Sequence, residues 1–259
     1  MLSNIFIFAL VLAPAVSAHG KVTVVTGNAG GNGTALAIRG GIVPGAGPNS
    51  KTEVDTTVFG KTNLLTNGLG KTTGSGKNHI SMLVQAMSLS GTTLPQITSA
   101  GGGGGGGNIS GVFHIVTADG AGPIQAVLDP TATGDFARGI PLPVLQQIPG
   151  EKGNFVTSTT KKQGRSLWER AVDHLLLREK RGAANVNQSF GFAFAVPAGT
   201  TCSGTVAGLT GVCLVKIANS NKAGPFGGVV PVQIAAAAAA KGTAGQAGQA
   251  AACGRAFRA

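Results

Sequence analysis

Charged residues, and acidic ones above all, are scarce in this sequence. Only 11% of its 259 residues are Asp, Glu, Lys or Arg, and nine of them are acidic. An ordinary globular domain carries about 25% charged residues. Glu, a strong helix former, occurs only four times, whereas Val, Thr and Gly are abundant. This composition argues against a helical bundle and favours short strands joined by glycine turns.

Motifs of several enzyme and nucleotide-binding classes are also absent. The chain has no G-x-S-x-G elbow, no H-E-x-x-H and no C-x-x-C, and residues 27–33 do not match G-x-G-x-x-G. Carboxylates are too few for an obvious glycosidase pair, although Glu53 and Asp55 lie two residues apart in a strand-like run. We interpret these two residues as solvated charges at a strand edge.

No apolar run is long enough to span a bilayer. The run at residues 5–13 has nine residues and is followed by Val16-Ser17-Ala18, a small-residue cleavage signature. We interpret residues 1–18 as a signal peptide, which predicts a secreted, extracellular protein without an integral membrane segment. Residues 19–234 are then the folded domain, and residues 235–259 are a low-complexity tail of Ala, Gly and Gln.

The net charge is strongly positive, at +11 near pH 7. A helix is predicted over residues 166–180, and it places Trp168, the single aromatic residue of the basic stretch 161–181, on its apolar face. Nucleic acid is therefore a poor partner, because no ring is left for base stacking. The basic residues up to Arg181 form either the solvated face at the end of this helix, which we favour, or a dibasic site for proteolytic processing. On a secreted protein, this charge predicts acidic polysaccharide or a membrane surface as the partner.

Cysteine is rare, with three residues in the chain. Cys202 and Cys213 bracket a turn-bearing segment, which suits a hairpin disulfide in a secreted protein. Cys253 has no predicted partner. Three N-x-S/T sequons predict glycosylation in a secretory lumen, at Asn32, Asn108 and Asn187.

Alternating apolar residues predict the main strands. One covers residues 21–25 and continues over 34–38 after a glycine turn, and two more cover residues 111–117 and 188–194. We therefore predict an all-β fold, a single immunoglobulin-like antiparallel β-sandwich with glycine-rich loops and one surface helix.

The few histidines are the candidate metal ligands. Cleavage after Ala18 would make His19 the first residue, so that its α-amine and its imidazole could bind one ion together. A second imidazole would complete three nitrogen ligands, which suit Cu(II). His114 is the preferred second ligand because a strand would hold its ring rigidly, although it could also be a core histidine. His79, in a loop or at a helix start, is the weaker choice.

An axial copper position would need another side chain, and the sequence has no Tyr. Three phenylalanines alternate along one predicted strand and could supply a ring there: Phe190, Phe192 and Phe194. Rings in such a pattern are more often part of a hydrophobic core, so both interpretations stay open.

Five segments carry a family resemblance: residues 19–22, 53–59, 111–123, 196–202 and 223–233. Together they resemble the fungal appressorium-associated secreted virulence-factor family, also called Gas-like or Egh-like. The resemblance extends over nearly all of residues 19–234. It implies a fungal protein produced during host penetration.

The order of an N-terminal His, a strand His and a late strand Phe is also similar to the histidine brace of lytic polysaccharide monooxygenases. That similarity implies copper held by His19 and His114. Two functions therefore stay open. In the favoured one, a virulence-associated protein binds polysaccharide at the host or cell-wall surface; in the other, it is a copper-dependent polysaccharide oxidase.

Overall fold

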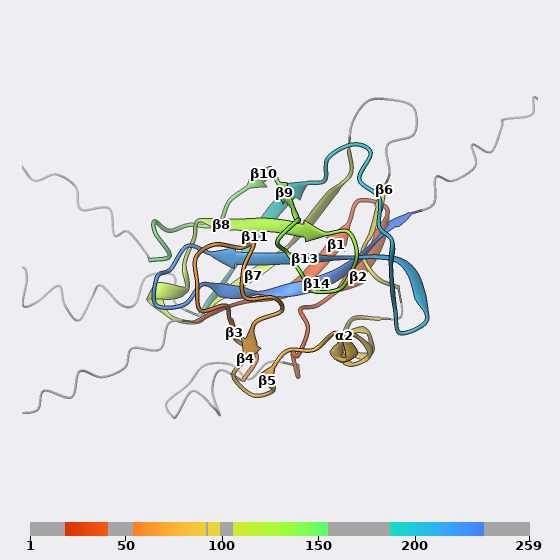
Figure 1. Cartoon of the computed structure of the whole chain (residues 1–259). Helices are drawn as coiled ribbons and strands as arrows, with labels where there is room; N and C mark the ends of the chain where they lie inside the picture. The colour runs from red at the N-terminus through yellow and green to blue at the C-terminus, as the bar shows by residue number, and fades with distance from the viewer. Residues whose placement is uncertain (1–18, 41–53, 92, 99–105, 155–186, 236–259) are drawn as a thin grey trace, which may run out of the picture.

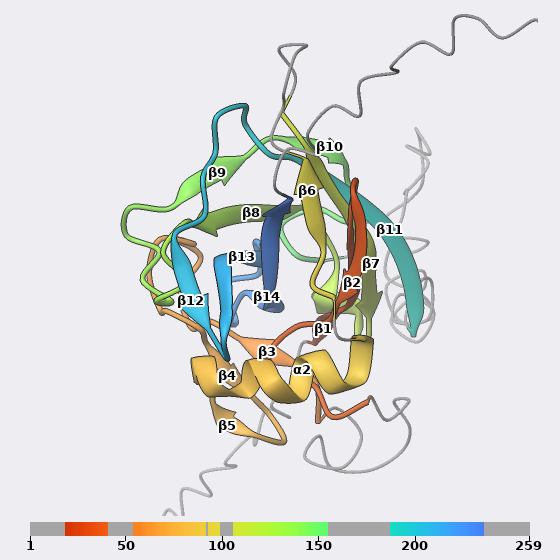
Figure 2. The same ribbon diagram turned by 90° about the vertical axis from the view of Figure 1, so that its right-hand side faces the viewer.

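The computed structural model describes residues 19–40, 54–91, 93–98, 106–154 and 187–235. Within these ranges the chain forms two β-sheets that lie against each other, together with one short α-helix (Figures 1 and 2). Nearly all strand pairs are antiparallel. The predicted all-β sandwich is therefore confirmed.

The first sheet has five strands, with β7 at its centre. In spatial order they are β10 (Val144–Gln146), β11 (Gln188–Ala195), β7 (Asn108–Ile115), β1 (Gly20–Gly27) and β2 (Gly30–Gly33). A bulge between Val22 and Val24 interrupts the pairing of β1 with β7. The predicted strands at 21–25 and 188–194 are confirmed as β1 and β11, and the strand predicted at 111–117 is β7, which begins and ends earlier.

The second sheet has nine strands. Along its main path lie β5 (Gly76–Lys77), β4 (Lys71–Thr72), β3 (Thr57–Val58), β14 (Phe226–Ala235), β13 (Leu209–Asn219), β8 (Ile124–Asp129) and β9 (Ile140–Leu142). Off this path, β12 (Gly204–Val206) pairs with β13, and β6 (Gln96–Thr98) pairs in parallel with β14.

Alternation along these strands builds two hydrophobic clusters. Between the sheets, Phe113 of β7 and Phe192 of β11 pack with residues such as Val215 and Val230 of the nine-stranded sheet. The neighbouring residues Leu214 and Val229 point to the opposite face of that sheet, where a second cluster forms. Both clusters consist almost entirely of buried aliphatic and aromatic side chains, which supply the main stabilisation of the fold.

The single α-helix of the described residues, α2 (Leu83–Ser90), covers part of the second cluster. It follows a 3-10 turn over Ile80–Met82 and buries Leu83 and Ala86. Figures 1 and 2 both show α2 at the same end of the molecule as β3, β4 and β5. The extent of this helix is not predictable from the sequence, since it is short and its ends have no side-chain cap. Another 3-10 turn covers Ala118–Gly120.

The strand predicted over residues 34–38 is wrong. β2 lies within the predicted glycine turn, and the chain then leaves the sheet. Ala37 adopts a positive φ of 66°, which is incompatible with an extended strand. Ala35 contributes to the cluster between the sheets and Leu36 to the second cluster, so this segment connects the two cores.

The predicted disulfide is confirmed. Cys202 and Cys213 are bonded, with their Cα atoms 5.1 Å apart, and they join the two sides of the β12–β13 hairpin.

Four other predictions concern residues outside the described ranges. They are the signal peptide at 1–18, the helix at 166–180 with Arg181, the tail at 235–259 except for residue 235, and Cys253 within that tail. Within the described ranges, no helix has the length and apolar character needed to cross a bilayer.

Candidate functional site

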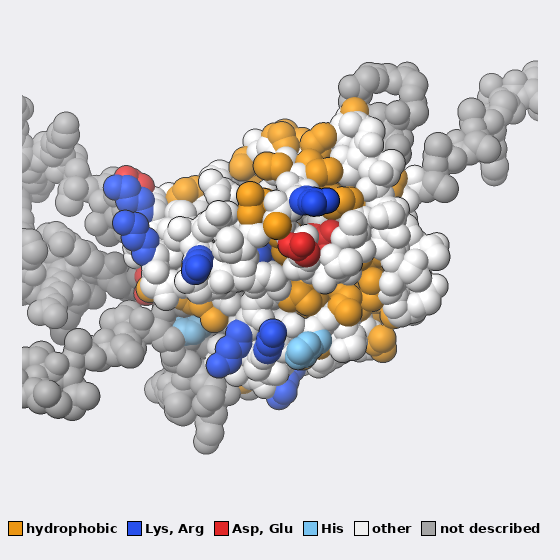
Figure 3. Space-filling model, in the orientation of Figure 1, with side chains coloured by type: hydrophobic (Ala, Val, Ile, Leu, Met, Phe, Trp, Pro, Cys, Tyr) orange, Lys and Arg blue, Asp and Glu red, His pale blue; other side chains and the backbone are white. Residues whose placement is uncertain are grey.

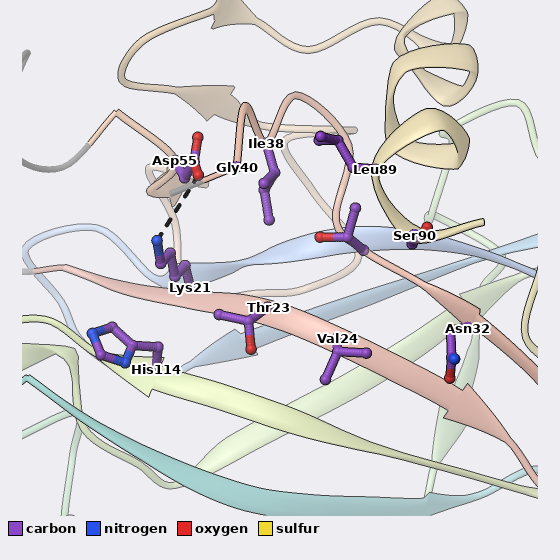
Figure 4. Close-up of a pocket in the computed structure, with 11 residues that line it drawn as sticks. Lys21, Thr23, Val24, Asn32, Ile38, Gly40, Asp55, Leu89, Ser90 and His114 are labelled. Atoms are coloured by element: carbon purple, nitrogen blue, oxygen red, sulfur yellow. Dashed lines mark ion pairs between the residues drawn. The ribbon is translucent and has the colours of Figure 1, made fainter. Parts of the chain in front are cut away.

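A pocket of about 510 Å³ lies beside β1, on the face of the five-stranded sheet that points away from the core between the sheets. The chain after β2, the residues before β3 and the end of α2 form its walls (Figure 4). The residues that line it are Lys21, Thr23, Val24, Asn32, Thr34, Ile38, Gly40, Asp55, Leu89, Ser90 and His114.

Lys21 and Asp55 form an ion pair at this pocket. The Lys21 Nζ atom lies 3.9 Å from Asp55 Oδ2, and the two side chains are only 12% and 1% exposed (Figure 4). Burial lowers the pKa of the Lys21 ammonium, and the Asp55 charge raises it in part. Low solvent access strengthens the attraction between the two charges.

The two oxygens of the Asp55 carboxylate differ in their surroundings. Oδ1 accepts the main-chain N–H of Arg39 at 2.7 Å. Oδ2 is buried and accepts no hydrogen bond from any described residue. Since the 3.9 Å separation from Lys21 is too long for a direct hydrogen bond, Oδ2 keeps an unused acceptor site at the pocket.

The interpretation of Asp55 as a solvated edge charge is therefore wrong. The residue is 2% exposed and lies in a turn before β3, not in a strand. Its burial is compensated by the Arg39 N–H and by the Lys21 charge, which the sequence spacing does not reveal. Glu53, the other member of that pair, lies outside the described residues.

His114 lies on β7, as predicted, opposite Lys21 of β1 and Ser189 of β11. Its Nδ1 lies 3.0 Å from Ser189 Oγ, and its Nε2 lies 3.1 Å from Asn187 Oδ1. Since an amide oxygen only accepts, Nε2 carries the proton and Nδ1 accepts from the serine hydroxyl. Burial lowers the pKa of His114, Lys21 lowers it further, and the Asn187 hydrogen bond raises it in part. Overall the pKa of His114 is lowered, which favours the neutral imidazole.

His19 lies next to the start of β1, and its backbone forms several hydrogen bonds. Its main-chain N donates to Thr117 Oγ1 at 2.6 Å, and its carbonyl accepts the N–H groups of Val116 and Thr117. The side chain is 6% exposed, and its ring centroid lies 5.4 Å from that of Phe226 on β14.

The fold brings the backbones of the two candidate copper ligands close together. Because Gly20 pairs with Ile115 and Lys21 with His114, His19 is offset from His114 by two positions across adjacent strands. Their rings contact different strands, His19 toward β14 and His114 toward β11. No cluster of three or more His, Cys, Asp or Glu suited to a metal occurs among the described residues. A site with two histidines and an amine stays a prediction.

The three candidate axial phenylalanines point into the core. Phe190 pairs with Phe113, while His114 pairs with the neighbouring Ser189, so the phenylalanines and His114 lie on opposite faces of the sheet. Phe192 and Phe194 are fully buried, and Phe190 packs against the same cluster. The structure thus places all three in the core and does not bring them together with His114.

The remaining predicted site residues are spread around the molecule. Asn32 of β2 is exposed and lines the pocket, and Asn187 is exposed beside His114. Asn108 is half-buried at the start of β7. His79 is exposed and immediately precedes the 3-10 turn before α2, so of the two predicted positions, a loop or a helix start, the structure shows the second. Glycosylation of the three asparagines stays a prediction.

Sequence reasoning missed Lys21 and Asp55 as partners. Lys21 is one of several Lys in a basic chain, and nothing in the strand pattern of residues 21–25 marks it as half-buried. The only local signal is its position on a strand with apolar residues, next to Val22 and three residues from Val24. The partner comes from a distant segment, which becomes visible only in the folded chain.

Comparisons with known proteins identify the family. Residues 17–227 match the family described as Egh16-like virulence factor. The appressoria-specific virulence factor GAS1 of Pyricularia oryzae is 31% identical over 235 residues, covering 90% of this chain and 79% of GAS1. GAS2 of the same fungus is 32% identical over 123 residues, covering 47% of this chain and 33% of GAS2. No solved structure matches. The chain belongs to the Egh16-like virulence factor family.

Proposed function

We propose that this protein is a secreted fungal virulence factor that acts at the host or cell-wall surface by binding polysaccharide, with one sugar unit in the pocket beside β1. The names of the relatives, appressoria-specific virulence factors, support the role in virulence. The predicted signal peptide and the three sequons support secretion.

The unused acceptor on Asp55 carries this proposal. A sugar hydroxyl placed between Asp55 Oδ2 and Lys21 Nζ would donate to the carboxylate and accept from the ammonium. Hydrogen bonds with one charged partner are stronger than those between neutral groups. The pair thus suits a ligand group that both donates and accepts, which is the defining property of a carbohydrate hydroxyl.

The rest of the pocket matches the mixed polarity of a sugar ring. Val24, Ile38 and Leu89 offer apolar contacts to C–H groups. Hydroxyl and amide groups from Thr23, Ser90 and Asn32 lie among them. Pockets that combine an apolar lining with a few placed polar groups are typical of small-ligand sites.

A polysaccharide sedimentation assay tests the proposal. The chain from residue 19 to 259 is mixed with insoluble chitin, β-glucan or cellulose, and the bound fraction is compared with that of Asp55→Asn and Lys21→Met. Asn at position 55 can still accept the Arg39 N–H, so the variant removes the charge with little change in shape. We expect both variants to lose binding to one of the polymers, and Lys222→Met, which removes an exposed lysine elsewhere, to retain it.

The proposal fails if the folded protein binds none of these polymers, or if Asp55→Asn and Lys222→Met bind equally well. Circular dichroism of each variant separates loss of binding from loss of folding. Uncharged soluble oligosaccharides titrated by calorimetry give the number of sites for these neutral polymers, which we expect to be one.

A copper histidine brace in a polysaccharide oxidase is a second candidate. The observation that favours it is the two-position offset of His19 and His114 on paired strands. In this candidate the His19 amine and both imidazoles would hold the ion, and one ring nitrogen of His114 would exchange Ser189 or Asn187 for the metal.

Calorimetry and electron paramagnetic resonance with Cu(II) test this second candidate. The chain beginning at His19 is compared with a chain carrying one extra residue before His19 and with His114→Ala. Tight type-2 copper binding that both changes abolish would support the brace. Absence of binding, or binding indifferent to the added residue, would exclude it.

A further inference from the structure

Three exposed lysines gather on the β3–β5 end of the nine-stranded sheet. Lys71 of β4 lies directly opposite Lys77 of β5, and on its other side it pairs with Val58 of β3. Lys61 follows β3 in an exposed loop. We refer to these three lysines as the basic surface. Figure 3 shows Lys and Arg side chains grouped at this end of the molecule, with no acidic side chain among them in that view.

The arrangement of the basic surface opposes stability. Like charges placed directly opposite each other on neighbouring strands destabilise a sheet. Within the described ranges, no carboxylate forms an ion pair with any of the three lysines. Protection of a sheet edge against aggregation would explain a lysine on β5, the last strand. It does not explain Lys71, because β4 has a neighbour on both sides.

A buried hydrogen-bond network fixes the backbone beneath these lysines. Thr72 and Asn78, which follow the two lysines in sequence, are buried on the opposite face. Thr72 Oγ1 lies 2.7 Å from Thr57 Oγ1 and donates to Asn78 Oδ1 at 2.9 Å, and Asn78 Nδ2 donates to the Leu69 carbonyl at 3.1 Å. The two lysines therefore project from a preorganised backbone, which reduces the entropy lost on binding.

The surroundings of the basic surface suit a soluble, flexible polyanion. A membrane-binding surface usually adds apolar side chains that enter the lipid. The exposed large apolar residues of the described chain lie on α2, on β10 and at Leu65, and none of them lies on β3, β4 or β5. Leu65 itself lines a hollow with Val144 and Pro141, near β9 and β10.

We propose that Lys61, Lys71 and Lys77 form a second binding surface, separate from the pocket, that binds the carboxylates of an acidic, uronate-containing polysaccharide. The inference rests on the proposed function for the class of partner, a polysaccharide, but not for the site. Ammonium groups exposed at one end of the molecule attract carboxylates of one polymer chain and raise its local concentration at the protein. Such binding weakens as salt screens the charges.

Binding to polygalacturonate at low and high salt tests this surface, with the fully methyl-esterified polymer as the uncharged comparison. The variant Lys71→Gln/Lys77→Gln is compared with Lys152→Gln/Lys222→Gln, which removes two exposed lysines from other loops. We expect the first variant to bind the acidic polymer roughly tenfold more weakly at low salt, and the control to bind like the unmodified protein.

Three results would overturn the proposal: equal losses in the two double variants, equal binding of the charged and esterified polymers, or binding to vesicles of anionic lipid without binding to the acidic polymer. The variant Asp55→Asn distinguishes failure of the pocket proposal from failure of the basic-surface proposal. If the pocket proposal fails and the basic surface is correct, Asp55→Asn has no effect on any polymer while Lys71→Gln/Lys77→Gln still weakens polygalacturonate binding. The reverse pattern identifies failure of the basic surface alone.

Discussion

The carboxylate of Asp55 holds the main-chain N–H of Arg39 with one oxygen and faces the ammonium of Lys21 across 3.9 Å with the other. One side chain thus fixes the chain after β2 and also balances a charge on β1. The same residue therefore contributes to the shape of the pocket and to its electrostatics.

Replacing Asp55 should reveal both contributions. Asp55→Ala leaves the Arg39 N–H without its acceptor and Lys21 without a countercharge, so we expect the free energy of unfolding to fall by about 2 to 4 kcal/mol. Asp55→Asn should cost less, because the amide oxygen still accepts. Urea unfolding measures both values. The double variant Lys21→Met/Asp55→Ala should recover part of the loss; strict additivity of the single changes would show that the two residues do not interact.

Removal of the disulfide should destabilise the protein by raising the conformational entropy of the unfolded chain. Cys202 and Cys213 close a loop with a sequence separation of 11. The loop-entropy relation gives about 3 kcal/mol for such a loop. We therefore expect Cys202→Ser/Cys213→Ser to unfold at lower urea concentration. Cys253→Ser is the control and should not change the midpoint; if a reducing agent lowers the midpoint of the double serine variant as well, another bond is involved.

Gly27, at the end of β1, should not tolerate a side chain. A Cβ atom there would lie 2.0 Å from the carbonyl oxygen of Gln96, a backbone atom that cannot move without shifting β6. We expect Gly27→Ala to lower the free energy of unfolding by about 2 to 3 kcal/mol. Gly191→Ala on β11 is the matched control, because its nearest neighbour is the flexible amide end of Gln146 at 3.2 Å. Equal midpoints for the two variants in urea would contradict this account.

The strands that the sequence predicts correctly are those whose pattern is local. On β11, apolar residues alternate from Phe190 to Phe194, and this alternation alone determines which face is buried. His114 is placed on a strand for the same reason. The segment 34–38 looks equally apolar, yet it leaves the sheet, because its side chains divide between two clusters that only the folded chain creates.

The candidate site was far less predictable than the strands. Asp55 is buried because the chain before β3 returns to β1, and no local pattern encodes that contact. The pairing of Lys71 with Lys77 likewise depends on a hairpin of two-residue strands, which are too short to show any periodicity. The alternating phenylalanines of β11 correctly indicated the core. They gave no information about His114, because the pairing of β11 with β7 places the phenylalanines and His114 on opposite faces of the sheet.

Lys216 is the most completely buried charge of the described chain, and it predicts a dependence of stability on pH. Its Nζ donates to the carbonyls of Leu64 and Thr66 at 3.0 and 2.6 Å. The same atom lies 4.8 Å from the centroid of the Phe59 ring and 4.4 Å from that of Phe136. Burial lowers the pKa of Lys216 from 10.5 to about 8.

Between these two pKa values the unfolded chain binds more protons than the folded chain at this residue. Linkage then requires the Lys216 contribution to the free energy of unfolding to rise as pH increases from about 8 to 10.5, and to be constant below pH 8. The absence of Tyr removes one group that would otherwise titrate in this window. The difference between the unmodified protein and Lys216→Met, measured by urea unfolding at a series of pH values, isolates the contribution of this lysine.

We expect Lys216→Met to be less stable by about 2 kcal/mol at pH 7, because the Leu64 and Thr66 carbonyls lose a charged donor. The deficit should widen between about pH 8 and 10.5, as the unmodified protein gains stability and the variant does not. Lys222→Met, which removes an exposed lysine, is the control for the loss of a surface lysine. A constant difference for Lys216→Met would mean that the two carbonyls and the two rings stabilise the ammonium enough to cancel its desolvation. In that case the pKa of Lys216 is not lowered, and its ammonium stays charged in the native core well above pH 8.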